Sequence, residues 1–335
     1  MNEIRKLALV GVLAALAGPA AAVTLDQYSS IYVFGDSLSD PGNLPAGAAP
    51  SSPPYYSDGS GFLPGGAGVQ FSDAPVWAER VGVTGNFAFG GAQAAPEAGG
   101  PPDLAEQIAL FDGYSVTVGG AAGGASDLAV IWLGANDLFG AIEAAVPLAL
   151  GGDLAGAIGV VTGAAASAAA AIGDGIEALA GRGFESFAVF NLPALEETPL
   201  FNLFQPGGAL LAEAGTDAFN GALLAEIASL AAYDVTFIDI AAVFEDLLAN
   251  PGAFGIENTT FPCVLPPSDG LAGSVCENPS AYAFFDAVHP TGTVHAAVAD
   301  VFHQAVAPIP LPAGLPLLAL GLGGLAIMRR RRVAV

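Results

Sequence analysis

Short apolar runs without polar–apolar alternation recur along the chain. They occupy residues 31–34, 128–133, 186–191 and 235–240. Each contains Val, Ile or Phe in close succession, which is typical of strands buried on both faces. Helical stretches are predicted over 137–180 (interrupted by glycines), 208–232 and 241–248. The alternation of strand and helix predicts an α/β fold with three layers, α/β/α, around a central parallel sheet.

The first 22 residues have the pattern of a secretory signal peptide. Arg5 and Lys6 form a basic start, residues 7–17 an apolar centre, and residues 20–22 a run of alanines suited to cleavage. A buried N-terminal helix is the alternative. With this segment removed, residues 23–307 form one domain of a size that buries a substantial core.

The C-terminal segment, residues 308–335, reads as a membrane tail. A proline-rich lead precedes the apolar stretch 315–328, and four arginines follow at 329–332. Such a stretch can enter a bilayer, and the arginines would keep the extreme C-terminus in the cytoplasm. The tail resembles the VPLPA variant of bacterial PEP-CTERM sorting signals. That resemblance implies cleavage by an exosortase-type enzyme, so the anchor at the cell surface would be temporary.

A second uncharged window, residues 154–173, is also long enough to span a bilayer. It consists mostly of Ala, Gly, Ser and Thr, with few large side chains. We therefore expect a buried or half-buried helix of the domain, with a transmembrane helix as the alternative.

Charge is distributed very unevenly between the domain and the two ends. Six of the eight Lys and Arg residues lie in the ends, whereas Glu3 is the only one of 32 acidic residues found there. The domain thus keeps two basic residues, Arg80 and Arg182, against 31 acidic ones. Such a surface disfavours nucleic acid and anionic membranes as partners. Lys6 is the only lysine, so the mature chain can have neither a P-loop lysine nor a Ser-Lys dyad.

Ser37 is the candidate nucleophile. It lies in Gly35-Asp36-Ser37-Leu38, directly after the first apolar run, and therefore at the carboxyl end of a predicted strand. Sites of open α/β sheets gather at such ends. A helix starting near Ser37 would favour negative charge there. A serine that only caps a helix after a turn is the alternative.

The candidate base is His289, three residues after Asp286. At this spacing on a bend, the carboxylate can accept the imidazole Nδ1–H and leave Nε2 free to take a proton from a serine. His295 and His303 lie on the next predicted helix without such a partner, and we interpret them as ordinary helix residues. The three histidines do not have the spacing of a metal site, so we expect neither a metal nor a cofactor.

Two further blocks offer groups that could stabilise an oxyanion. Gly90 and Gly91 permit close backbone approach to a substrate, and Asn136 follows the run 128–133 by one short turn. An Asn amide donates a hydrogen bond without gaining charge, although Asn also closes tight turns. Asp137 is predicted to cap the helix that follows.

Together these four blocks resemble the SGNH (GDSL) hydrolase superfamily. Segments 190–193 and 239–254 are also similar to its bacterial lecithinase/haemolysin-type branch, so the resemblance covers nearly all of residues 28–307. It implies a flavodoxin-like SGNH-hydrolase fold and an exported serine esterase or lipase that hydrolyses carboxylic esters. The implied site comprises the catalytic residues Ser37, Asp286 and His289, with oxyanion donors from Ser37, Gly91 (Gly90 as the alternative) and Asn136.

The substrate class stays open between an acyl lipid and an acylated glycan. The branch often has Trp before the aspartate of its last block, where this chain has Phe285, and the Gly-rich segment after Ser37 is longer than usual. Both departures concern acyl-chain preference. A carbohydrate O-acetyl esterase acting on surface polysaccharide is one alternative, and a non-catalytic surface matrix protein is another. Residues 41–68 and 252–279 form loops that flank the blocks, either as substrate-shaping segments or as ordinary surface loops.

Cys263 and Cys276 are the only cysteines, thirteen residues apart. In an exported chain this pair predicts a structural disulfide rather than a metal pair.

Overall fold

The computed structural model describes residues 25, 27–49, 55–117, 123–265 and 274–307. Residues Leu25–Val306 form one compact unit. The predicted signal peptide and C-terminal tail lie outside the described residues.

Five parallel strands form the central sheet, in the order β2-β1-β3-β4-β5. Their bounds are β1 Ser30–Gly35, β2 Gly85–Asn86, β3 Asp127–Trp132, β4 Ser186–Phe190 and β5 Asp234–Ile238. The four predicted strands and the parallel sheet are confirmed, and the strand order is that of a flavodoxin-like fold. The strand β2 was not predicted, because its two residues contain no apolar run and pair with β1 only through tertiary contact.

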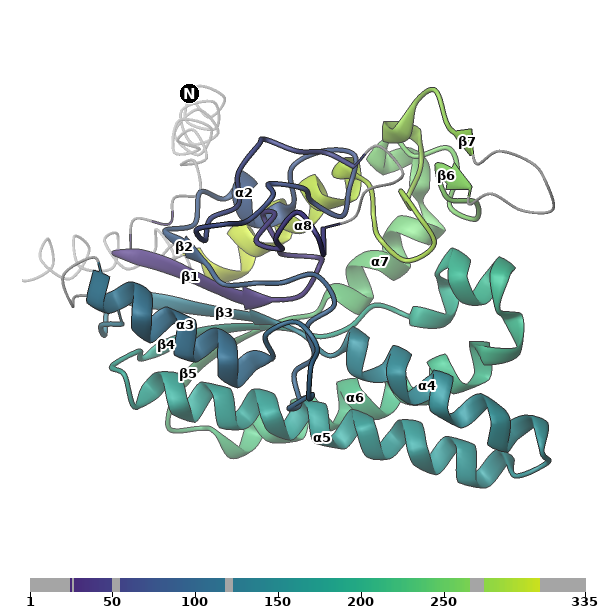
Figure 1. Cartoon of the computed structure of the whole chain (residues 1–335), viewed down its shortest axis with the longest axis horizontal. Coiled ribbons are helices and arrows are strands. Elements are labelled where there is room, and N and C mark those ends of the chain that lie inside the picture. Colours follow the sequence, from purple (N-terminus) through teal and green to yellow (C-terminus); the bar gives the residue numbers. More distant parts are fainter. Residues whose placement is uncertain (1–24, 26, 50–54, 118–122, 266–273, 308–335) are drawn as a thin grey trace, which may run out of the picture. The chain divides into compact units, whose positions relative to one another are not determined.

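The helices lie on both faces of the sheet (Figure 1). On one face are α3 (Leu104–Thr117), α4 (Ala135–Leu150), α5 (Leu154–Ala180) and α6 (Ala209–Ser229). On the other, α2 (Trp77–Arg80) packs against α8 (Gly292–Val306), while α7 (Ile240–Ala249) follows β5. The three-layer α/β/α fold class is therefore established by the strand order and the helix layers.

Shorter elements complete the unit. They are the antiparallel pair β6 (Val264–Leu265) and β7 (Ser274–Val275), and the one-turn helices η1 (Leu195–Glu197), η2 (Leu200–Phe204), η3 (Pro206–Gly208), η4 (Pro251–Phe254) and η5 (Pro279–Ala281).

The predicted stretch 137–180 is two helices rather than one interrupted helix. The break falls at Gly151–Asp153, where Gly152 has a φ of 89° and the Asp153 side chain accepts a hydrogen bond from Gly156 N (2.8 Å). The glycines within α5 do not interrupt it. The helix α3 was missed, although its buried residues Leu104, Ile108 and Phe111 have helical spacing.

The helix α5 contains the apolar window 154–173. By length and composition alone it could cross a membrane. In this fold it lies against α3, α4 and α6, with a stripe of buried small residues that includes Ala157, Ala165 and Ala168. The prediction of a half-buried domain helix is confirmed.

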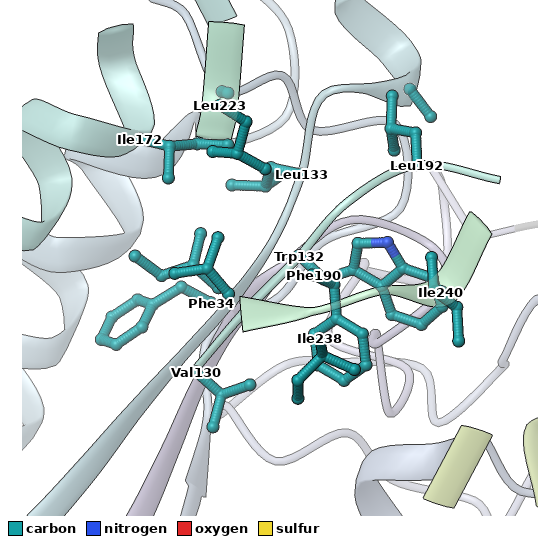
Figure 2. Close-up of a cluster of buried hydrophobic side chains, with 14 of the residues drawn as sticks. Phe34, Val130, Trp132, Leu133, Ile172, Phe190, Leu192, Leu223, Ile238 and Ile240 are labelled. Carbon is teal, nitrogen blue, oxygen red and sulfur yellow. The ribbon is translucent and has the colours of Figure 1, made fainter. Parts of the chain in front are cut away.

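The core follows the strands of the sheet (Figure 2). Phe34, Trp132 and Phe190 are fully buried, and the Trp132 and Phe190 rings stack with centroids 4.7 Å apart. The register pairs Gly35 with Trp132, and Phe190 with Ile238. Neighbouring strands therefore end together, and the segments after them leave the sheet at one common edge. The buried side chains of the strands hold this edge of the sheet in place.

Candidate active site

Ser37 lies in a turn that begins where β1 ends. The Asp36 carboxylate accepts a hydrogen bond from Leu38 N (3.0 Å), and the Asp36 carbonyl accepts from Ser39 N (3.0 Å) and Asp40 N (2.9 Å). These bonds form a tight turn that directs Ser37 into a cavity. No helix begins at Ser37, contrary to the possibility raised from the sequence.

The structure brings Ser37, His289 and Asp286 together, although 252 residues separate the first two. His289 Nε2 lies 2.8 Å from Ser37 Oγ, and His289 Nδ1 lies 2.8 Å from Asp286 Oδ2. The second oxygen, Asp286 Oδ1, accepts from the backbone N–H groups of Val288 (2.9 Å) and His289 (2.8 Å). A proton on Ser37 can therefore pass to Nε2 while Asp286 orients the ring through Nδ1.

The environment of Asp286 keeps it ionised. Burial raises the pKa of a carboxyl group, but attraction to His289, the hydrogen bond with its ring and the two backbone N–H groups outweigh this. The pKa of Asp286 is lowered to about 2. It is a carboxylate at neutral pH and can stabilise a positive charge on the imidazole.

Candidate oxyanion donors lie beside Ser37. Gly90 N donates to Asp40 Oδ2 (2.7 Å), so its N–H is already used. Neither Gly91 N nor Ser37 N donates to any acceptor among the described residues, and both residues line the cavity. Gly91 has a φ of 82°, in the region that favours glycine. Of the two glycines considered, Gly91 is therefore the one with a free donor.

Asn136 lies in the first turn of α4, also at the cavity. Its Nδ2 donates to the Ala92 carbonyl (2.9 Å) and lies 3.5 Å from Asp36 Oδ2. The second contact is at the limit of a hydrogen bond. The amide hydrogen that faces Asp36 is therefore weakly bonded, and it is available to donate to a substrate oxygen.

A cavity of about 930 Å³ opens beside these groups. Its lining is mostly apolar, including Leu38, Phe71, Phe139, Leu192, Leu195, Leu200, Phe244, Leu248, Phe284 and Val288. Its ionisable side chains other than His289 are acidic; they are Asp36, Glu196, Glu197, Asp239 and Glu245. The cavity therefore suits an apolar group and disfavours an anionic one.

Comparison with known families identifies the family of this chain. The profile of the GDSL-like Lipase/Acylhydrolase family matches residues 31–302, which is most of the chain. The chain belongs to this family. As a GDSL enzyme, it acts on ester bonds.

Individual relatives are distant. A phosphatidylcholine-sterol acyltransferase of Aeromonas hydrophila is 27% identical over 84% of this chain and 90% of its own length. Among solved structures, phospholipase A1 from Streptomyces albidoflavus NA297 is 17% identical, with 82% of this chain and 99% of that chain covered and a TM-score of 0.43. An acetylxylan esterase from Geobacillus stearothermophilus is 14% identical, with 85% and 98% covered and a TM-score of 0.41.

Two buried carboxyls of this GDSL enzyme connect its blocks. Asp40 accepts from Gly90 N and, through its other oxygen, from Gly42 N (2.8 Å) and Asn43 N (2.6 Å). Asp137 accepts from Ala94 N (2.8 Å) and Ala95 N (3.0 Å). The prediction that Asp137 caps its helix is wrong, because α4 begins at Ala135 and Asp137 already lies inside the first turn.

Neither carboxyl has a cationic partner among the residues that the structure describes. Burial, which is the largest effect, raises the pKa of Asp40 and of Asp137 to about 6, although each accepts backbone hydrogen bonds that oppose the rise. Burial likewise raises the pKa of Asp36 to about 7. The sequence analysis missed Asp40 as a structural residue, although it lies in the same block as Ser37.

The other two histidines lie outside the site. His295 is fully buried, and its Nδ1 accepts a hydrogen bond from Trp77 N (3.3 Å). Burial, with smaller effects from Arg80 and His289, lowers the pKa of His295 to about 3, so it is neutral. His303 lies in the last turn of α8 and does not line the cavity.

The disulfide predicted between Cys263 and Cys276 is confirmed. It joins β6 to β7. Cys263 N donates to the Phe284 carbonyl (2.9 Å) and Val264 N to the Phe285 carbonyl (2.8 Å). The bonded pair of strands therefore supports the segment that leads into Asp286.

Proposed function

We propose that this GDSL enzyme is an exported serine esterase or lipase that hydrolyses carboxylic esters through Ser37, His289 and Asp286. The observation that carries the proposal is the series of two 2.8 Å contacts, from Asp286 through His289 to Ser37, at the wall of an apolar cavity. This arrangement supplies a nucleophile, a base and a group that orients the base.

The reaction would proceed in two halves. Ser37 Oγ attacks the ester carbonyl while His289 Nε2 takes its proton, and the resulting oxyanion accepts from Ser37 N–H, Gly91 N–H and the Asn136 amide. The tetrahedral intermediate collapses as His289 gives the proton to the leaving alcohol, which yields an acyl-enzyme. Water then attacks with His289 again as base, and collapse returns the proton to Ser37 and releases the acid.

The cavity supports a substrate with a medium or long acyl chain. Its volume of about 930 Å³ far exceeds the space of an acetyl group, and its lining is mostly apolar. The name of the Aeromonas relative supports placement in the lecithinase-type branch, with a phospholipid as acyl donor. It also supports a second candidate function, in which an alcohol such as a sterol replaces water as the acyl acceptor.

Export is proposed from the two ends of the sequence. The segment 1–22 has the features of a signal peptide, and 308–335 those of a sorting tail. Signal peptidase would remove the first segment and an exosortase-type enzyme the second. The domain would then act at the cell surface or outside the cell, after transient anchoring in the membrane.

The test is hydrolysis of p-nitrophenyl esters from acetate to palmitate by the full chain beside Ser37→Ala. We expect the substitution to lower kcat by at least about 10⁴-fold while the protein keeps its fold. Equal rates in a folded Ser37→Ala variant would contradict the proposed mechanism.

The profile over chain length separates the candidate functions. Activity that is strongest on medium or long chains supports a lipid esterase, whereas serine-dependent activity confined to acetate supports a glycan O-acetyl esterase. Silence across the series from folded protein favours a non-catalytic role. Addition of a sterol to a phospholipid assay tests for transfer, since transfer yields a sterol ester.

A further inference from the structure

Tyr55 contacts the site from a segment far away in the sequence. Its hydroxyl donates to Asp286 Oδ2 at 2.8 Å, across 231 residues. The same oxygen contacts His289 Nδ1, while Oδ1 accepts two backbone N–H groups. Among the described residues, Tyr55 and His289 are thus the two side chains that bond this carboxylate.

The ring of Tyr55 is fixed independently of its hydroxyl. It packs edge-on against Phe285, with centroids 5.5 Å apart, and at 6.0 Å from Phe71. It also joins a small hydrophobic cluster with Cys263 and Val264, separate from the main core. Removal of the hydroxyl alone therefore leaves these ring contacts in place.

The hydroxyl of Tyr55 remains a donor at working pH. Burial raises the pKa of Tyr55, and the negative charge of Asp286 and the hydrogen bond to it raise the pKa further. Tyr55 therefore keeps its proton and supplies a permanent hydrogen bond to Asp286.

We propose that Tyr55 is a positioning residue for the Asp286–His289 pair. It acts on the base, His289, through Asp286. Terminal carboxylate torsions are broad, so an oxygen with fewer partners turns more freely. The hydrogen bond from Tyr55 fixes Oδ2 toward Nδ1 of His289 and draws part of the negative charge away from the imidazole. The proposal rests on the proposed function, in which His289 is the base.

Without the Tyr55 hydroxyl, Asp286 would attract a proton on His289 more strongly. In the variant, His289 would then lose its proton, and become able to act as a base, only at higher pH. The other ionisable groups near the pair are Asp36, which interacts with His289, and the neutral His295. The substitution Tyr55→Phe removes no contact of either group.

The experiment compares Tyr55→Phe with Tyr56→Phe in the full chain, on the p-nitrophenyl ester that the wild type prefers. The Tyr56 hydroxyl has no hydrogen bond among the described residues and lies outside the cavity lining. For Tyr55→Phe we expect kcat to fall about tenfold with KM changed less than about twofold. The acid limb of its kcat/KM profile should move to higher pH. Tyr56→Phe should match the wild type.

A double-mutant cycle with Asp286→Ala, which removes both acceptor oxygens, tests the route of the effect. If Tyr55 acts through Asp286, Tyr55→Phe changes nothing further in the Asp286→Ala background. An equal fall in both backgrounds would overturn the proposal. So would an unshifted pH profile accompanied by a lower melting temperature, since that is the result of a merely structural role.

The two proposals fail in different ways. Wild-type rates and pH profile in Tyr55→Phe, beside an inactive Ser37→Ala, would overturn the role of Tyr55 alone. Activity in a folded Ser37→Ala would overturn the proposed function itself.

Discussion

Burial raises the pKa of the carboxyl groups around Ser37 and of the one beside His289, yet their net pKa shifts have opposite directions. Burial raises the pKa of Asp36 to about 7 and that of Asp40 and Asp137 to about 6, because backbone N–H groups only partly offset it. Asp286 is partly buried, yet its pKa is lowered to about 2 because attraction to His289, the hydrogen bond with its ring and two backbone N–H groups outweigh burial. The first group accepts hydrogen bonds from backbone N–H groups, whereas Asp286 also bonds the His289 ring.

The candidate site has two halves, a nucleophile half with Ser37 and Asn136 and a base half with Asp286 and His289. These halves differ in the contacts that hold them in place. Ser37 and Asn136 follow neighbouring strands of the sheet and lie directly above the main core. Asp286 and His289 lie on a bend after Phe285, which belongs to the small separate cluster. The nucleophile half is thus fixed by the fold as a whole, while the base half depends on loop contacts and one disulfide.

After Ser37→Ala, the largest effect we expect comes from a second change in the nucleophile half. Asn136→Ala removes one candidate oxyanion donor, which should lower kcat by about 10²–10³-fold. The acid limb of the pH profile should stay in place, because the Asp286–His289 pair is untouched. The measurement is kcat across pH on a p-nitrophenyl ester.

Asn250→Ala, at the exposed end of α7, is the matched control and should leave kcat unchanged. A rate near that of the wild type in Asn136→Ala would mean that backbone N–H groups alone stabilise the oxyanion.

A second change weakens mainly the base half. Replacing both Cys263 and Cys276 by serine should cost roughly 3 kcal/mol of unfolding free energy, from the entropy of closing a short loop. Amide exchange should rise more over residues 282–289 than over 31–35, which belong to β1. Hydrogen exchange read by mass spectrometry, with denaturant unfolding, checks both points. Equal changes in the two segments would show that the halves are not separate.

The smallest effect concerns pH. A carboxyl with a raised pKa binds protons in the folded state before it does so unfolded, so stability rises as pH falls from about 8 to about 5. Asp286 has the opposite sign, and its contribution is lost below about pH 4. We expect Tm to rise by a few degrees and then fall, as followed by thermal unfolding.

The acidic surface also makes the folded protein more stable as pH falls, because protonation reduces the repulsion between its carboxylates. Salt screens that surface term but acts little on buried groups. Asp36→Asn at high salt should therefore flatten the rise between pH 8 and 5. An undiminished rise in that variant would exclude Asp36 as its source.

Most of the sheet could be predicted from local patterns in the sequence. The apolar runs located four of the five sheet strands, because strands buried on both faces leave no polar positions. The helical spacing of Leu104, Ile108 and Phe111 was also present but overlooked. The strand β2 has no such signal, since pairing with β1 alone makes it a strand.

The candidate site was predicted less completely. Motif order indicated which residues would meet, and the structure brings Ser37, His289 and Asp286 within hydrogen-bond distance. The predicted capping role of Asp137 assumed that the helix begins at that residue. The helix α4 begins two residues earlier, at Ala135, so the prediction was wrong. The contact of Tyr55 depends on how a Gly- and Pro-rich loop folds back on the domain. No local pattern encodes such a contact.

The composition of α5 has a consequence for translocation. Large aliphatic and aromatic side chains drive lateral partitioning of a segment from the translocon into lipid, whereas alanine and glycine contribute little. The helix Leu154–Ala180 is built largely of those small residues, which still allow close approach to α4 and α6. In the exported chain proposed above, this helix, uncharged over residues 154–173, would pass through the membrane without stopping there. The same residues that bring its neighbours close would also keep it from acting as a stop-transfer sequence.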